Sequence, residues 1–202
     1  MTTLHVGPRL SPRDRVDILI AEYNALYGLA TVRMGALDRR VPAAGAALLA
    51  FMGSVPLLPE TTQYLFLVAI PVSLIWLLRT TINHARSFED LLRRIELIEI
   101  SLNRLADEEL LGFQSSHPSR LRTVGGRTGA ETVSAVFLAA IVLVAASAVV
   151  GLGALQASSI ALGYVCFLSI VTIYLAWLLL GWSRYRYTAQ PREDNGAARA
   201  AE

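Results

Sequence analysis

The stretch that decides the fold is "AEYNALYGLATVRMGALDRRVPAAG", from Ala21 to Gly45, because in it a charged helix runs directly into an apolar segment. Its first half carries Glu22 and Arg33 and has the composition of a water-exposed helix. Its second half goes straight into apolar residues after Arg39 and Arg40. The stretch therefore indicates a membrane helix with a long polar extension, and the function of that extension becomes the central question.

The overall composition favours a membrane protein. Of the 202 residues, 54% are hydrophobic and 17% are charged, with a net charge of +2. Soluble domains average about 25% charged residues. The charges here are also crowded into the segments that separate four apolar blocks.

These four blocks predict four transmembrane helices, because a membrane helix needs about 20 mainly apolar residues. We expect spans at 41–58, 62–78, 133–155 and 158–182, arranged as two helical hairpins. The first two blocks are short, and a rival interpretation joins them into one re-entrant or interfacial unit.

The distribution of arginine predicts the orientation. The connectors within each hairpin contain no arginine, whereas the other ends of the blocks are rich in it. By the positive-inside rule, both termini and the middle of the chain are cytoplasmic. This places the tail 1–11, the loop 112–132 and the tail 183–202 on that side. All 18 basic residues are arginine, as in many GC-rich bacterial genomes, so we expect the bacterial inner membrane.

Two charged segments carry heptad patterns, which are typical of paired helices. One is 12–40, which starts at the capping residues Ser11-Pro12. The other is 79–111, with Gly112 as its expected stop. The apolar positions recur at steps of three and four residues, and they are Val16, Ile20, Tyr23, Tyr27, Ala30, Met34, Leu37 and Val41, then Phe88, Leu91, Ile95, Ile98, Leu102 and Leu105.

The two segments predict an antiparallel two-helix stalk in the cytoplasm, because one rises into the first span and the other descends from the second. The fold class is thus an all-α integral membrane protein with four spans and this stalk. The same seams also suit pairing between chains, so a homo-oligomer is expected. The stalk is then either a scaffold or a sensor whose repacking acts on the spans.

No motif indicates catalysis, a cofactor or a metal. "VGGRTGAET", from Val124 to Thr132, lacks the lysine of a phosphate-binding loop and is interpreted as a glycine-rich turn before the third span. His5, His84 and His117 are scattered without metal-ligand spacing. His84 follows the second span and is either a pH sensor or an interfacial polar residue. We therefore predict a protein that is not an enzyme and has no catalytic, cofactor-binding or metal-binding residues.

Inside the spans, a few residues stand out from the apolar background. Pro71 is expected to kink the second span. A mild polar stripe either lines a narrow pore or forms hydrogen bonds between helices. It comprises Ser134, Ser147, Ser169 and Thr172. Ion-coupled transporters normally place acids or bases in the membrane, and the near absence of such groups here makes transport the weaker alternative.

The order of these features resembles a loose family of uncharacterised bacterial multi-span membrane proteins, in which a cytoplasmic E-Y-x-x-L helix leads into a transmembrane hairpin. Glu22, Tyr23, Leu26 and Arg33 match the first part, and Trp76, Ile82 and Glu96 match the second, over about 17–112. This chain departs from the pattern at Tyr27, where an arginine is usual. It also adds the third and fourth spans.

Similar helical stalks occur in bacterial antiphage effectors that damage the membrane when triggered. By this analogy we expect an oligomeric inner-membrane protein whose stalk senses a signal or a cytoplasmic partner and whose spans respond, as a pore-forming effector in antiviral defence or stress. A structural adaptor that recruits a cytoplasmic partner is the first alternative, and a small-molecule transporter the second. The expected partners are the lipid bilayer, further copies of the chain and that cytoplasmic partner or signal, with no nucleic acid.

Overall fold

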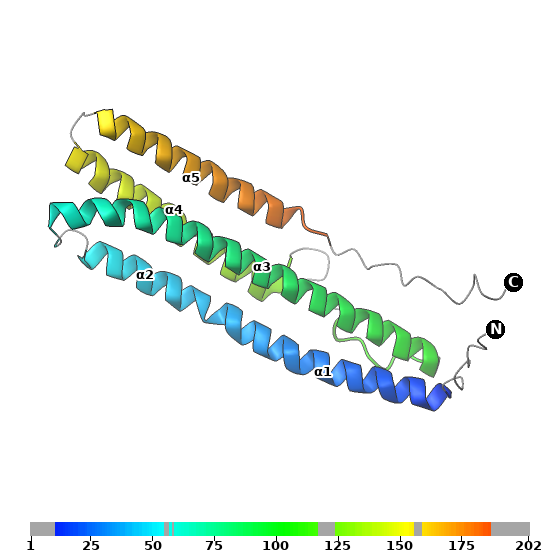
Figure 1. Cartoon of the computed structure of the whole chain (residues 1–202). Helices are drawn as coiled ribbons and strands as arrows, with labels where there is room; N and C mark the ends of the chain where they lie inside the picture. The colour runs from blue at the N-terminus through cyan, green and yellow to red at the C-terminus, as the bar shows by residue number, and fades with distance from the viewer. Residues whose placement is uncertain (1–10, 55–56, 58, 117–123, 156–158, 187–202) are drawn as a thin grey trace, which may run out of the picture.

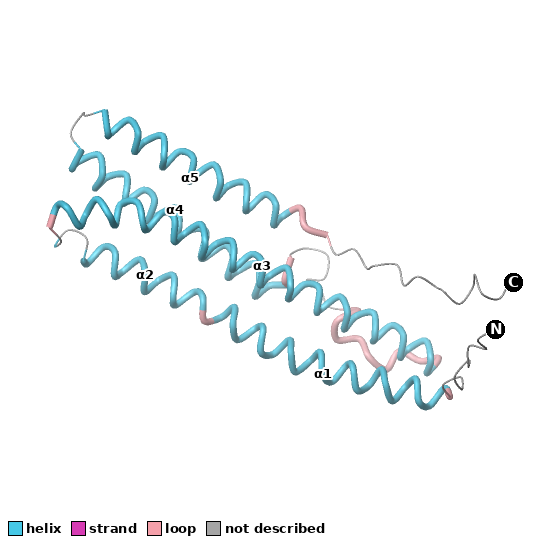
Figure 2. The backbone as a smooth tube through the Cα atoms, viewed as in Figure 1, coloured by secondary structure: helices cyan, strands magenta, loops and turns pink. Residues whose placement is uncertain are grey.

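The computed structural model describes residues 11–54, 57, 59–116, 124–155 and 159–186, and this part of the chain is helical with no strand (Figures 1 and 2). The prediction of an all-α fold is confirmed. Three of the predicted segments lie wholly or partly outside the described residues: the two tails and the middle of the loop 112–132. His5 and His117 lie in these parts. The helices are α1 (Pro12–Asp38), α2 (Arg40–Ser54), α3 (Glu60–Ala106), α4 (Gly126–Leu155) and α5 (Ser159–Ser183).

Helix α1 begins with a capping box. The Ser11 hydroxyl accepts a hydrogen bond from the Asp14 N–H at 3.1 Å, and the Asp14 carboxylate accepts one from the Ser11 N–H at 3.0 Å. The helix ends at Asp38, and α2 begins at Arg40. The joint between α1 and α2 therefore falls at the predicted border between the first charged segment and the first apolar block.

Helix α3 joins the predicted second span and the second charged segment into one helix of 47 residues. It ends at Ala106, before the predicted end at Leu111. Asp107 takes a left-handed conformation with φ of 54°, and the Asn103 side chain accepts the N–H groups of Leu110 and Leu111. These contacts turn the chain away from the helix before Gly112 is reached.

Helices α4 and α5 form a hairpin. Helix α4 starts at Gly126, ahead of the predicted boundary at 133, directly after a turn at Gly125 with φ of 77°. A side chain at Gly125 would also place its Cβ 2.9 Å from the Ala85 carbonyl oxygen, so glycine is needed there. The interpretation of "VGGRTGAET" as a turn into an apolar helix agrees with this geometry.

The apolar halves of α2 and α3 pack with α4 and α5 around one core, which includes Phe51, Leu78, Leu143 and Leu175. Figure 1 shows that the α4–α5 hairpin covers the first part of α3, while α1 runs beside the rest in the opposite direction. Three helical stretches are long and apolar enough to cross a membrane: Leu67–Ala106, Gly126–Gly153 and Ile160–Ser183. A fourth span in α2, which has 15 residues, stays a prediction.

A second, smaller core lies between α1 and the polar half of α3. Its buried residues are Ala30, Leu37, Phe88, Leu91 and Ile95, with Tyr23, Leu26, Tyr27 and Leu92 packed against them. If this pair lies in water, each fully buried leucine or isoleucine contributes about 1.5–3 kcal/mol to the free energy of packing. The two helices run antiparallel (Figure 1), and their assignment as a cytoplasmic stalk stays a prediction.

Candidate functional site

The structure gathers only part of the predicted heptad seam. On α3, Phe88, Leu91, Ile95 and Ile98 are buried, whereas Leu102 is half-buried and Leu105 is exposed. On α1, Ala30 and Leu37 are buried, Tyr23 and Tyr27 pack against the core between α1 and α3, and Val16 is half-buried. The side chains of Ile20 and Met34 are 44% and 42% exposed.

The reason is a different choice of face on α1. The residues of α1 that are at least half-buried include a run with the same steps of four and three, and Tyr27 of the predicted heptad packs beside it. This run is Leu19, Tyr23, Leu26, Ala30, Arg33 and Leu37. Two overlapping heptads share Tyr23, Ala30 and Leu37. The sequence pattern favoured the one with Met34 because it is apolar throughout. The face with Leu26 is the one used because Arg33 meets a polar group, His84, across the interface.

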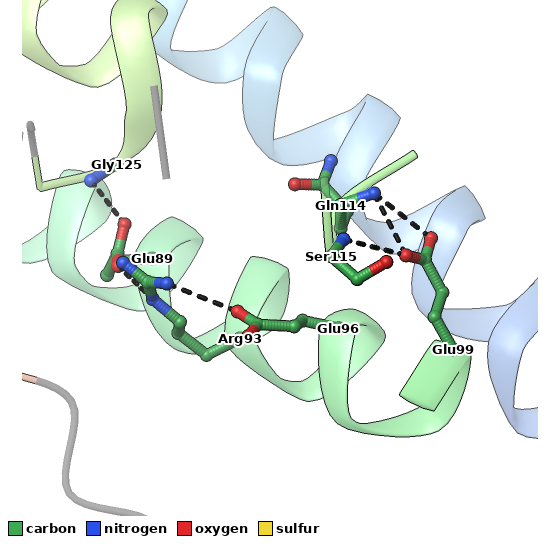
Figure 3. Close-up of polar contacts among 7 residues, drawn as sticks. All are labelled: Glu89, Arg93, Glu96, Glu99, Gln114, Ser115 and Gly125. Carbon is green, nitrogen blue, oxygen red and sulfur yellow. Dashed lines mark hydrogen bonds and ion pairs between the residues drawn. The ribbon is translucent and has the colours of Figure 1, made fainter. Parts of the chain in front are cut away.

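Three glutamates on α3 are buried although charged side chains rarely are. They are Glu89, Glu96 and Glu99. Figure 3 shows Glu89 directed to Gly125, Glu96 to Arg93, and Glu99 to Gln114 and Ser115. Sequence reasoning missed this group because a glutamate at helical spacing normally indicates a solvated face.

Glu99 is fully buried and holds the first part of the connecting segment. Its carboxylate accepts hydrogen bonds from the backbone N–H groups of Gln114 and Ser115, both at 2.9 Å (Figure 3). The hydroxyl of Tyr23 on α1 donates a third bond at 3.2 Å. One carboxylate thus joins α1, α3 and the connecting segment, with charge-assisted bonds that are roughly twice as strong as neutral ones.

Glu89 holds the other end of the same segment. One of its oxygens accepts the Gly125 N–H at 2.9 Å, and the other pairs with the Arg93 Nε at 2.6 Å. Arg93 also pairs with Glu96 at 3.1 Å, so the guanidinium compensates two buried carboxylates (Figure 3). The start of α4 is therefore tied to α3 through a buried ion network.

Aromatic rings surround Glu99. The rings of Tyr23 and Tyr27 lie 4.9 Å apart, and Phe113 lies 6.0 Å from Tyr27. Burial raises the pKa of Tyr23 well above its ordinary value, and Tyr27 and Glu99 add to the shift. Both tyrosines therefore stay protonated over the physiological range, which keeps Tyr23 a donor to the carboxylate.

A second polar contact joins α3 to the end of α5. The Arg86 guanidinium donates to the Gly181 carbonyl at 2.7 Å and lies over the ring of Tyr185 at 5.3 Å. The Tyr185 hydroxyl donates to Asp90 at 2.5 Å. Burial, followed by the bond to Asp90, raises the pKa of Tyr185 to about 12. Arg86 thus satisfies a terminal carbonyl of α5, which has no partner within its own helix.

Within a single chain, the four residues of the predicted polar stripe do not face one another. The hydroxyl groups of Ser147 and Tyr164 are bonded at 2.6 Å in the core, whereas Ser134 is exposed on the surface of α4. Ser169 and Thr172 are exposed on α5, and each bonds a backbone carbonyl of its own helix. Pro71 is buried within α3, which continues as a helix through it. A pore along this stripe would need several chains.

A groove of about 210 Å³ lies between the apolar parts of α2, α3 and α4. Phe51, Ile70, Leu74 and Leu143 are among the residues that line it. Its one hydroxyl, that of Ser73, is bonded to the Ala69 carbonyl. The lining of the groove is therefore mainly apolar, and its one hydroxyl already donates its proton within α3. Within the described residues, no group of three His, Cys, Asp or Glu side chains is placed to hold a metal ion.

The fold and these contacts define a helical protein with membrane-type apolar helices and a polar two-helix extension. No protein-family model, curated protein or solved structure matches the chain.

Proposed function

We propose that this chain is an oligomeric protein of the bacterial inner membrane, whose cytoplasmic stalk receives a signal or a partner and whose spans respond by changing the permeability of the membrane. The observation that carries the proposal is the continuity of α3. Its 47 residues correspond to a rod of about 70 Å that runs from the apolar core into the α1–α3 pair. A displacement of the stalk is therefore delivered directly to the packing of the spans.

The buried carboxylates support a stalk with more than one arrangement. Glu89 and Glu99 bind the connecting segment through backbone N–H groups, so a change at the α1–α3 pair reaches the start of α4 as well as α3. Buried polar networks have few satisfactory geometries, because an unpaired member is costly. Such a network favours discrete states over gradual deformation, which is what a switch requires.

In the proposed topology, α2 is the fourth span and both termini are cytoplasmic, as the arginine pattern predicts. The packing of Ala44 and Phe51 of α2 into the same core as α4 and α5 supports this arrangement. A permeability change requires several chains, since the polar side chains of one chain do not face a common channel. Helix α5 exposes apolar residues such as Ile170, Ile173 and Trp177, which suit contact with lipid or a second chain.

The test is induced expression in bacteria with a dye that reports membrane potential. Two exposed positions of α3, Asn83 and Ser87, lie just beyond its apolar half. In helix propensity, the double change Asn83→Gly and Ser87→Gly is about 1 kcal/mol per residue less favourable than the matched Asn83→Ala and Ser87→Ala pair, so the two variants differ in the stiffness of the rod. We expect depolarisation with the wild-type and alanine chains and a weaker effect with the glycine chain. Equal, unchanged potential in all three would contradict the permeability proposal.

A structural adaptor is the second candidate, and one observation favours it. The tip of the stalk exposes Leu110 and Phe113, whose side chains are 63% and 60% exposed. Apolar residues at such a tip suit recruitment of a cytoplasmic protein. This candidate predicts a stable soluble partner that is lost on Phe113→Ser, together with an unchanged membrane potential.

A further inference from the structure

Three basic side chains from different helices meet where α1 joins α2. Arg33 of α1 places its Nη1 atom 3.3 Å from the Nδ1 atom of His84 on α3. Arg40, the first residue of α2, donates to the hydroxyl oxygens of Thr80 at 2.9 Å and Thr81 at 3.3 Å. The charges of both arginines act on His84, so the three groups share one local field.

These guanidinium groups have no carboxylate partner among the described residues, although both are half-buried. On the same helix pair, Arg93 and Arg94 have carboxylate partners, whereas the half-buried Arg86 donates to the Gly181 carbonyl. Arg94 pairs with Glu22 at 2.8 Å, and Arg93 pairs with two glutamates. Partly buried cations without a counter-charge are costly, because desolvation is not offset by attraction. The cluster therefore has the electrostatics of an anion site.

The cluster also lies at a defined depth. Arg40 immediately precedes the apolar block that starts at Val41, and Thr80 follows the apolar run that ends at Leu78. The hydrogen bond between Arg40 and Thr80 thus joins the two chain segments at the same border of the apolar region. In a bilayer this border is the level of the lipid headgroups.

We propose that Arg33, Arg40 and His84 form a binding site for the phosphate of an anionic lipid. A planar guanidinium group can donate two parallel hydrogen bonds to phosphate oxygens. This geometry distinguishes a binding site from general attraction between a basic surface and anionic lipids. In the free state Nδ1 of His84 accepts from Arg33, since arginine has only donors. A bound phosphate offers both residues an acceptor in its place. The site holds α1, α2 and α3 together, and it requires only that the apolar helices lie in a bilayer.

The experiment uses the purified full chain in a neutral detergent, with added phosphatidylglycerol, phosphatidylcholine or sodium phosphate. Native mass spectrometry counts the retained lipids, and thermal unfolding reports stabilisation. We expect the wild-type chain to retain phosphatidylglycerol in preference to phosphatidylcholine and to unfold at a higher temperature with it. Arg33→Gln and Arg40→Gln should each weaken retention roughly fivefold or more.

Two neighbouring arginines provide matched controls. Arg39 and Arg79 are exposed at nearly the same level, and each glutamine variant removes the same charge without touching the cluster. Retention should survive Arg39→Gln and Arg79→Gln. Equal losses in all four variants would reduce the effect to surface attraction and overturn the site.

Two wild-type results decide the proposal even if the variants fail to fold. Equal retention of the two lipids would contradict an anionic-lipid site. Equal stabilisation by sodium phosphate would assign the cluster to a free phosphate compound and overturn the lipid assignment. Neither result depends on the membrane potential, so this proposal and the permeability proposal fail separately.

Discussion

The two halves of α3 show how the surroundings change the meaning of a sequence pattern. In the first half, Val72 and Trp76 are exposed and Leu74 and Leu78 are buried, so both faces are apolar. In the second half the exposed face is largely polar, the buried face is apolar, and three glutamates interrupt that face. On a helix that water surrounds, the apolar side chains show which face packs inward. Where lipid surrounds it, small residues and hydrogen bonds decide which face packs inward.

The largest expected effect comes from placing a charge in the core between α1 and α3. Leu37→Glu buries an unpaired carboxylate and should destabilise the α1–α3 pair by about 4 kcal/mol, because desolvation of the charge adds to lost packing. Hydrogen exchange of α1 peptides in detergent measures this loss. Asn24→Glu, at an exposed position, is the control and should leave exchange unchanged.

A variant at Met34 distinguishes pairing within a chain from pairing between chains. Met34 lies on the predicted seam but is exposed in the single chain. Met34→Glu should therefore leave the α1–α3 pair intact. Hydrogen exchange of α1 checks that the pair is intact, and light scattering measures the oligomer. If Met34→Glu dissociates an oligomer, the predicted heptad that contains Met34 is an interface between subunits.

Removal of the buried carboxylate comes next. Glu99→Ala leaves two backbone N–H groups and the Tyr23 hydroxyl without their acceptor, which should cost about 3 kcal/mol. Amide exchange at Gln114 and Ser115 should accelerate, while α5 stays protected. Glu108→Ala, an exposed carboxylate nearby, serves as the control. Unchanged exchange at both amides would show that Glu99 does not hold the connecting segment.

A smaller effect is expected in the apolar helices, where Gly151 of α4 lies against Tyr164 of α5. A Cβ atom at Gly151 would overlap the ring of Tyr164, so Gly151→Ala should cost about 1–3 kcal/mol and disturb the bond between Tyr164 and Ser147. Gly153→Ala and Gly163→Ala enter open space and should be tolerated. Thermal unfolding in detergent compares the three variants, and equal melting temperatures would refute the close contact.

The smallest effect concerns acidification at the joint of the two halves. Burial, then Arg40 and Arg33, lower the pKa of His84 below 6.5, so the unfolded chain binds its proton more readily than the folded chain. Above pH 6.5 His84 is neutral in both states, and the folded chain keeps its full stability. As the pH falls from 6.5 through the lowered pKa, the unfolded chain takes up the proton first, so the free energy of unfolding decreases. In neutral detergent the wild-type chain should lose more stability between pH 7.5 and 5.5 than His84→Gln does. Equal losses would show that His84 is not coupled to folding, and added phosphatidylglycerol should reduce the wild-type loss.

The helical class, the capping at Ser11 and the border near Arg40 were predictable from the sequence. They depend on local composition and on periodicity, which determine which segments leave water and where a helix begins. The turn at Gly125 was predictable for the same reason. The buried face of α3 was also visible in its spacing, because apolar residues on a water-exposed helix mark the interior.

Only the tertiary structure decided which of two overlapping heptads on α1 faces α3, since both satisfy the same spacing. It also decided that Glu89, Glu96 and Glu99 are buried. The i,i+4 spacing of Glu89 and Arg93 is local, but no local pattern brings the backbone N–H groups of the connecting segment to Glu89 and Glu99. Likewise, Arg33, Arg40 and His84 come from three helices and meet only when those helices pack. Composition and spacing specify the elements, whereas the long-range contacts between polar groups specify how those elements pack and where a ligand can bind.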